Sequence, residues 1–189
     1  MLFKKLIEKL YLSMDGNLVY FDQTTKCHSR YYYDNIVKEK YNDRLCYTIY
    51  VDINGLKSIN DKYGHHEGTK LIKQVASDLL NIEGAKDICR VGGDEFVLFA
   101  DEDFDVSQME EVENISYGIH LKYASEDVVS ACKKADSKMY IMKKIKKNII
   151  VWIKLMFYQK MYGICSSVVC YMCYFCIKIK EGVWYLWII

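Results

Sequence analysis

Two adjacent glycines followed by two acids, Gly92-Gly93-Asp94-Glu95, stand between two short apolar runs and strongly constrain the fold of this chain. The runs at residues 88–91 and 96–100 have the length and composition of strands. Because glycine adopts positive φ readily, we expect the two glycines to form a tight hairpin turn. Asp94 and Glu95 then lie at the hairpin mouth, where neighbouring carboxylates repel unless a cation lies between them. The pattern indicates either a divalent metal site that also holds phosphate or a solvated acidic turn.

A third carboxylate precedes the hairpin by about 40 residues. Asp52 lies near the end of an apolar segment, residues 46–53, that we expect to be a central strand. A carboxylate at the carboxyl end of a strand, followed by a glycine-containing loop, faces the edge where such sheets bind ligands. The backbone N–H groups of residues 54–57, which include Leu56 and Lys57, are placed to cradle phosphates there. Alone, Asp52 would more often be a turn former, but with Asp94 and Glu95 it makes a cluster of three carboxylates.

Hydrophobic periodicity predicts the remaining elements. We expect helices at residues 29–39, 68–81 and 125–144, and strands at residues 114–121 and 148–152. The predicted order of strands and helices is that of an α+β fold, a ferredoxin-like or polymerase-palm antiparallel sheet with helices packed on it.

Four sequence blocks, in this order, resemble those of the GGDEF domain of diguanylate cyclases. They lie at residues 22–31, where Asp22, Thr25 and Arg30 match, and at residues 52–68, 90–96 and 135–143. The resemblance covers residues 22–152 and implies a GGDEF-type fold for that part of the chain. We therefore expect an amphipathic helix and lead-in at residues 1–21, a nucleotidyl cyclase domain at 22–152, and an apolar tail rich in cysteine and tyrosine at 153–189.

The resemblance implies a reaction and its residues. Two GTP molecules, one on each protomer of a homodimer, would be condensed to cyclic di-GMP and pyrophosphate. Mg²⁺ or Mn²⁺ would be held by Asp52, the Ile53 carbonyl, Asp94 and Glu95, with the last two as catalytic residues.

The resemblance also implies the substrate-binding residues. Asn60 matches a residue that contacts guanine, Lys143 a triphosphate-binding lysine, and Lys147 stands where the family has an arginine. Thr69 replaces the usual aspartate that reads guanine. That change is similar to the hybrid promiscuous type, so we expect ATP to be accepted beside GTP, with cyclic GMP-AMP as a further product.

Two alternatives stay open. One is a catalytically silent nucleotide-binding regulatory module of the same type, and the other is a related palm-type oligonucleotide cyclase. The segment at residues 97–115 is shorter than the family's usual helix and loop, and only residues 105–112 could supply a turn or two of helix. The complete set of Asp52, Asp94 and Glu95 favours an active enzyme.

Composition and charge suggest the setting. The net charge of +1 gives no sign of a nucleic-acid partner, and eight cysteines without a secretory signal suggest free thiols in the cytoplasm. The uncharged run at residues 161–177 is at the lower limit of membrane-spanning length. We expect it to form a membrane helix, an interfacial or partner-packing helix, or a tail without a shaped function. A membrane or interfacial helix would associate the protein with a membrane.

Overall fold

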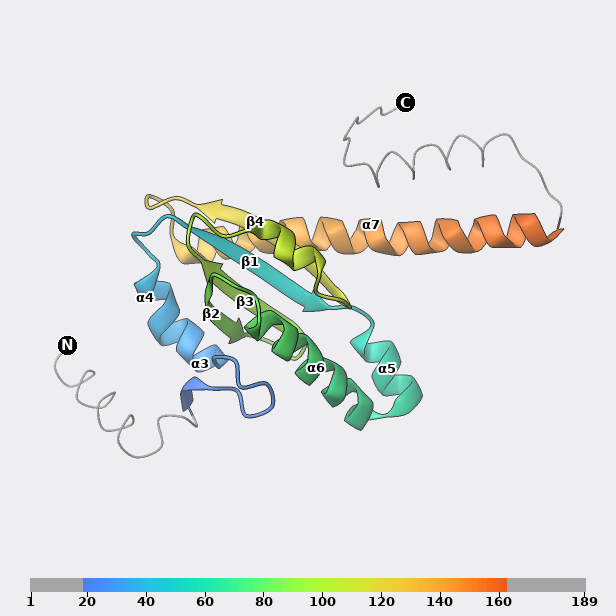
Figure 1. Ribbon diagram of the computed structural model, residues 1–189, viewed down its shortest axis with the longest axis horizontal. Helices are drawn as coiled ribbons and strands as arrows, with labels where there is room; N and C mark the ends of the chain where they lie inside the picture. Colours follow the sequence, from blue (N-terminus) through green and yellow to red (C-terminus); the bar gives the residue numbers. More distant parts are fainter. Residues whose placement is uncertain (1–18, 163–189) are drawn as a thin grey trace, which may run out of the picture. The chain divides into compact units, whose positions relative to one another are not determined.

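The computed structural model describes residues 19–162, and the chain divides into two compact units, Met1–Met142 and Lys143–Ile189. The first unit contains a four-stranded antiparallel sheet in the order β2-β3-β1-β4 (Figure 1). Its strands are β1 (Cys46–Ile53), β2 (Ala85–Arg90), β3 (Glu95–Ala100) and β4 (Ile115–Lys122). This is the strand order of the ferredoxin-like arrangement, so the predicted fold class is confirmed.

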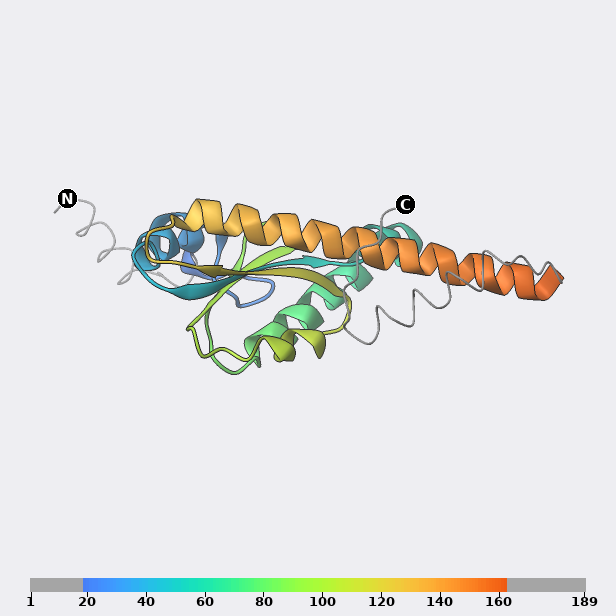
Figure 2. The same ribbon diagram turned by 90° about the horizontal axis from the view of Figure 1, so that it is seen from above.

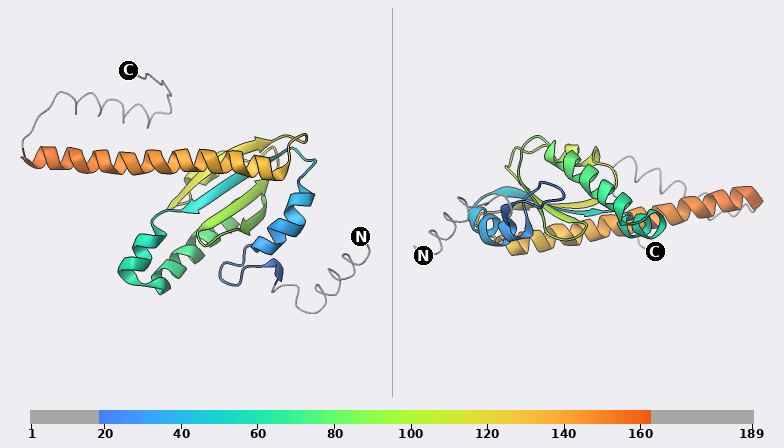
Figure 3. Two further views of the ribbon diagram at one scale, coloured as in Figure 1. Left: turned by 180° about the vertical axis from the view of Figure 1, so that it is seen from behind. Right: turned by 90° about the horizontal axis from the view of Figure 1, so that it is seen from below.

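Helices cover both faces of the sheet, as the edge-on view in Figure 2 shows. One face packs against α6 (His65–Leu80), which follows the short α5 (Leu56–Tyr63). The other face packs against the first part of α7 (Val128–Tyr162) and against a helical segment near the N-terminus. That segment consists of α3 (Arg30–Tyr32), the π-helical turn η1 (Tyr33–Val37) and α4 (Lys38–Lys40), and it is visible from behind in Figure 3.

The alternation of side chains along the strands divides the core between these two faces. Val51 and Leu98 point toward α6, where they join Leu79, and all three are fully buried. Phe99 points to the opposite face, where its ring stacks on Tyr41 with 4.6 Å between the ring centroids. The sheet is therefore the middle of three layers.

The connection from β3 to β4 is as short as the sequence suggests. It contains one 3₁₀ turn, η2 (Val106–Glu110), which begins where the Asp105 carboxylate accepts a hydrogen bond of 2.9 Å from the Ser107 N–H. Phe104 and Met109 are buried against the α6 face of the sheet. Two large side chains thus cover part of the face that a longer helix would occupy.

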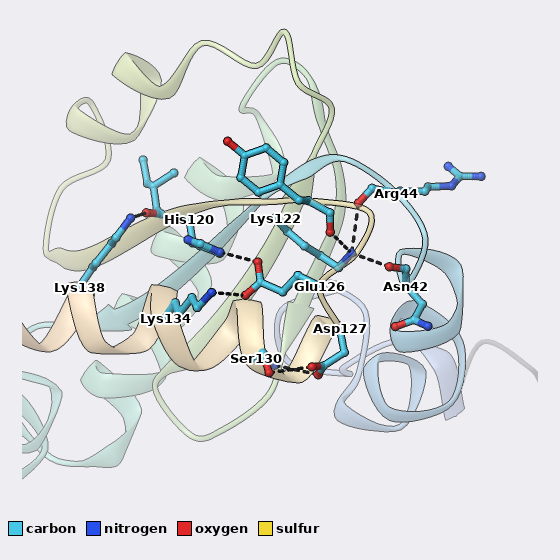
Figure 4. Close-up of polar contacts among 11 residues, drawn as sticks. Asn42, Arg44, His120, Lys122, Glu126, Asp127, Ser130, Lys134 and Lys138 are labelled. Atoms are coloured by element: carbon cyan, nitrogen blue, oxygen red, sulfur yellow. Dashed lines mark hydrogen bonds and ion pairs between the residues drawn. The ribbon is translucent and has the colours of Figure 1, made fainter.

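Polar contacts fasten β4 to the start of α7 (Figure 4). One carboxylate oxygen of Glu126 lies 2.8 Å from His120 Nε2, and the other lies 2.8 Å from Lys134 Nζ. The fully buried Lys122 ammonium donates to three main-chain carbonyls, those of Asn42, Arg44 and Tyr123, at 2.6 to 3.1 Å. These carbonyls take the place of the water molecules that the ammonium group loses when it is buried.

The predicted strand at residues 148–152 is wrong, because α7 continues through this segment as far as Tyr162. A short run of Ile and Val fits a strand or a buried helix equally well, and nothing between Lys144 and Asn148 breaks a helix. No element ends at residue 152, because α7 continues through it. The domain boundary predicted at that residue stays a prediction.

Within residues 19–162, the structure has no helix long and apolar enough to cross a bilayer. The membrane run predicted at residues 161–177 lies, apart from its first two residues, outside the described part of the chain, and so does the helix predicted within residues 1–21.

Candidate functional site

The sheet brings the three predicted carboxylates to one end of β1 and β3. Asp52 is the cross-strand partner of Glu95, and the Ile53 N–H donates a hydrogen bond of 2.9 Å to the Asp94 carbonyl. Asp52 is buried, with 7% of its surface exposed. Ile53 pairs on its other side with Ile115 of β4, so the central strand fixes the site from both sides.

The hairpin turn is built differently from our expectation. Neither Gly92 nor Gly93 has a positive φ, so that part of the prediction is wrong. Instead, the N–H groups of Val91 and Gly92 both donate to the Glu95 carbonyl, at 2.9 and 3.3 Å. A Cβ atom on Gly92 would lie 2.5 Å from Glu95 Oε2, whereas one on Gly93 would meet nothing within 4 Å. Gly92 therefore leaves room for the Glu95 side chain, which lies against it.

Two arginines brace the turn, Arg90 at the end of β2 and Arg30 in α3. Arg90 donates to the Asp22 carboxylate at 3.0 Å and to the Gly93 carbonyl at 2.7 Å. Arg30 donates to the Val91 carbonyl at 3.0 Å. Asp22 and Arg30 belong to the first of the four sequence blocks, so the structure gives that block a role in holding the acidic turn.

The site carries an excess of negative charge. Burial raises the pKa of the Glu95 carboxyl, and the charges of Asp94, Asp52 and Asp136 raise it further, against a hydrogen bond from the Tyr50 hydroxyl that lowers it. Burial and the charge of Glu95 in turn raise the pKa of Tyr50. A bound cation would relieve this repulsion.

Sequence reasoning missed two residues of the site. Asp136, on α7, lies in the last of the four sequence blocks but received no role. Tyr50 precedes Asp52 by two positions on β1, and the period of a strand places both side chains on the same face. That spacing was the signal that could have identified Tyr50.

The donor set suits Mg²⁺ or Mn²⁺ shared with a substrate. Among the described residues, no three acidic, cysteine or histidine side chains converge as a metal-binding group. Mg²⁺, however, is commonly bound by one or two carboxylates together with substrate phosphates, rather than by an all-protein cage. The adjacent Asp52 and Glu95, with the main chain at Ile53, offer such a set.

The loop after β1 supplies fewer free N–H groups than expected. The Asn54 N–H donates to the Asn114 carbonyl at 2.7 Å, and the Asn54 side chain accepts from Ser116 at 2.7 Å. Asn54 is thus a structural residue, and the expectation that its N–H cradles phosphate is wrong. Leu56 and Lys57 form the first turn of α5, after Gly55, whose φ of 73° places it in the left-handed region.

Helices α5 and α6 bring the two predicted base-reading residues close together. A Cβ atom on Gly68 would overlap the Asn60 side chain, so Asn60 lies directly against Gly68 of α6. Gly68 immediately precedes Thr69. The Thr69 hydroxyl donates a hydrogen bond of 2.8 Å to the His65 carbonyl. Its oxygen can therefore still accept a hydrogen bond, but its proton is engaged.

The comparison with protein families decides what kind of domain this is. Residues 19–149 match the family described as "Diguanylate cyclase, GGDEF domain". The chain belongs to the GGDEF domain family. The resemblance of the four sequence blocks to the GGDEF domain is thereby confirmed.

Individual relatives are similar to parts of this GGDEF protein. The bifunctional diguanylate cyclase/cyclic di-GMP phosphodiesterase MucR of Pseudomonas aeruginosa is 36% identical over 87 residues, 43% of this chain and 13% of MucR. The cyclic di-GMP phosphodiesterase PdeR of Escherichia coli is 38% identical over 53 residues, 28% of this chain and 8% of PdeR. The chain thus spans a small fraction of the length of these curated relatives.

A solved structure supports the fold of the GGDEF domain. The coiled coil and GGDEF domain of DgcB from Caulobacter crescentus, in complex with c-di-GMP, is 20% identical, with a TM-score of 0.64. The match covers 75% of this chain and 90% of that one.

The two predicted triphosphate lysines lie on α7 in the second unit of the GGDEF protein. Lys143 and Lys147 both follow Met142, where the first unit ends. Their roles stay predictions.

Proposed function

We propose that this GGDEF domain is a diguanylate cyclase, a nucleotidyltransferase that condenses two GTP molecules to cyclic di-GMP and pyrophosphate. The observation that carries the proposal is the pairing of Asp52 with Glu95, whose pKa is raised by burial and by three neighbouring carboxylates. Such a concentration of negative charge destabilises a protein unless a cation binds there. The name of MucR, a relative with diguanylate cyclase activity, points the same way.

Each residue has a role in this proposal. Asp52, the Ile53 carbonyl, Asp94 and Glu95 would hold Mg²⁺ or Mn²⁺, which when bound polarises the α-phosphate and acidifies the attacking ribose hydroxyl. The first turn of α5, at Leu56 and Lys57, binds the phosphates through its N–H groups, and Lys143 and Lys147 add positive charge. Asn60 and Thr69 contact the base.

The reaction requires a homodimer, because one domain holds one nucleotide and the product joins two. Each protomer presents the 3′-hydroxyl of its GTP to the α-phosphate on its partner. Turnover per protein molecule should therefore rise with protein concentration until the dimer predominates.

A catalytically silent regulatory module is the second candidate. It is favoured by the short connection between β3 and β4 and by Thr69 in place of the usual aspartate. The similarity to PdeR, which is named as a phosphodiesterase, points the same way. Such a module would bind GTP without turning it over. The two candidates differ in whether a cyclic product forms.

The deciding experiment uses the full chain with Mg²⁺ or Mn²⁺ and labelled GTP, ATP, or both, followed by identification of the products. We expect cyclic di-GMP from GTP alone, and a loss of at least about 100-fold in Asp52→Asn and Glu95→Gln, because these carboxylates act where charge develops. Asp103→Asn, an exposed acid on the β3–β4 connection, is the matched control and should retain activity. GTP binding without any cyclic product would establish the silent module, and a longer cyclic oligonucleotide would establish the palm-type alternative.

A further inference from the structure

Positive charge is concentrated in the last part of the chain. Between Asp136 and Glu181 the sequence has no acidic residue at all. The same stretch contains nine lysines: Lys138, Lys143, Lys144, Lys146, Lys147, Lys154, Lys160, Lys178 and Lys180. The overall net charge of +1 therefore conceals an acidic first part and a strongly basic second part.

Five of these lysines lie in residues 143–154 of α7, here called the basic segment. Three large aliphatic side chains of this segment are exposed to solvent: Ile150 at 54%, Val151 at 50% and Ile153 at 46%. On a helix, residues four positions apart lie on one face, so Lys146, Ile150 and Lys154 form one row and Lys147 and Val151 another. Aliphatic groups and ammonium groups thus alternate along the same surface of the helix.

We propose that the basic segment binds the surface of a membrane that contains anionic lipids. A helix that lies in the interface buries aliphatic side chains among the acyl chains, while its lysines extend their stems and keep the ammonium groups at the headgroups. Clusters of four to eight basic residues on such a helix are typical of sites for anionic headgroups. The proposal depends on the positive charge and on the exposed aliphatic groups of the segment. Because Lys143 and Lys147 also have a role in the proposed function, the variants that test lipid binding leave both unchanged.

Other partners suit the basic segment less well. A second copy of the same segment would bring five more lysines against the first five, without a carboxylate to pair them. A nucleic acid would attract the lysines, but it offers Ile150, Val151 and Ile153 no apolar surface to bury. An anionic bilayer satisfies both kinds of side chain.

The test is flotation of the full chain with lipid vesicles. We expect binding to vesicles of phosphatidylcholine and phosphatidylglycerol in equal parts, weak binding to phosphatidylcholine alone, and release at high salt. The variant with Lys144→Gln, Lys146→Gln and Lys154→Gln should bind roughly 100-fold more weakly, since each lysine near an anionic surface contributes about fivefold. The control variant changes three exposed lysines of the first unit, Lys26, Lys73 and Lys133, to Gln and should bind as the wild type does.

A second variant separates lipid binding from simple charge attraction. Ile150→Gln with Ile153→Gln keeps every lysine, and it should still reduce vesicle binding several-fold, because aliphatic burial is lost. Circular dichroism of each variant should show the helical content of the wild type. The proposal would be overturned if the two triple-lysine variants lost vesicle binding equally, or if the isoleucine changes had no effect on it. Tighter binding to a DNA duplex than to the anionic vesicles would overturn it too.

Discussion

Asp52, near the end of β1, lies directly opposite Glu95, the first residue of β3. Cross-strand partners point to the same face of a sheet, with Cβ atoms about 5 Å apart, so the two carboxylates share one environment. Antiparallel pairing thus joins residues that are far apart in the sequence. The energetic cost of this pairing can be measured without any catalytic assay.

Glu95→Gln should stabilise the metal-free protein slightly. The folded-state pKa of Glu95 is raised above its ordinary value of 4.5, so its contribution to stability is fully present below pH 4.5 and is lost as pH rises through the folded pKa. At neutral pH the ionised side chain therefore opposes folding. The gain should stay below about 1 kcal/mol, because solvent screens a partly exposed group.

Thermal unfolding in the presence of a chelator measures this gain. The difference between wild type and Glu95→Gln should shrink as the pH is lowered to 4.5, and Mg²⁺ should stabilise the wild type more than the variant. A variant less stable than the wild type at neutral pH without metal would contradict the repulsion inferred at the site.

Gly92→Ala should impair catalysis with little effect on folding. The new methyl group would lie 2.5 Å from Glu95 Oε2, the end of a flexible side chain, and 3.2 Å from Glu95 Cβ. The carboxylate must therefore move, whereas the turn itself has to give by only a few tenths of an ångström. We expect a fall in kcat of about tenfold or more, since misplaced catalytic groups lose rate steeply. Gly93→Ala is the matched control, because its methyl group meets nothing within 4 Å. Measuring kcat and unfolding curves for both variants would show whether catalysis depends on the position of the Glu95 carboxylate.

Thr69→Asp should increase the preference for GTP over ATP. An aspartate accepts hydrogen bonds from guanine N1–H and the 2-amino group, whereas it repels the N1 acceptor of adenine. The Thr69 hydroxyl donates to the His65 carbonyl and so offers only a neutral acceptor. The charge-assisted bond is worth about 1.5 to 3 kcal/mol, roughly 10-fold to 100-fold in selectivity.

Product analysis in an equimolar mixture of ATP and GTP provides the measurement. The wild type should yield some cyclic GMP-AMP and Thr69→Asp should yield less. If both proteins gave pure cyclic di-GMP, base selectivity would reside elsewhere.

Asp87→Asn should destabilise the domain in a pH-dependent way. Asp87 is buried on β2 and accepts hydrogen bonds from Tyr41 and, at 2.6 Å, from Lys40. Burial raises its pKa, but the hydrogen bonds from Lys40 and Tyr41 lower it more, so the net pKa lies below the ordinary value of 3.8. Its contribution to stability is therefore present above pH 3.8 and is lost as pH falls through the folded pKa.

Urea unfolding as a function of pH tests this contribution. At neutral pH the variant should lose about 1 to 3 kcal/mol, and its stability should depend less on pH below 4 than that of the wild type. Asp43→Asn, an exposed acid on the loop before β1, serves as control. An unchanged pH dependence in Asp87→Asn would show that another carboxyl governs acid unfolding.

The fold could be predicted from the sequence where apolar runs end in clear turn signals. The central strand has the bounds expected for it, residues 46–53, because a loop with Gly55 follows it. The strand expected at 148–152 is instead part of α7. No glycine or proline separates these apolar residues from the lysine-rich helical sequence before them, so nothing ends the helix there.

The candidate site was predictable in composition but not in detail. Motif spacing identified Asp52, Asp94 and Glu95, since residue types and order are visible in a sequence. The turn hydrogen bonds at Gly92 and the charge of Asp136 near Glu95 depend on three-dimensional packing, which spacing does not encode.

The short connection through η2 has a consequence for how the sheet assembles during folding. β3 and β4 pair with opposite edges of β1, and the chain between them, from Ala100 to Ile115, must close a loop around that strand. Loop closure becomes entropically cheaper as the loop shortens, by about 0.6 kcal/mol for each halving of its length. Lengthening this connection with a flexible Gly-Ser insert should therefore slow refolding, since contacts between distant residues would have to form across a longer loop.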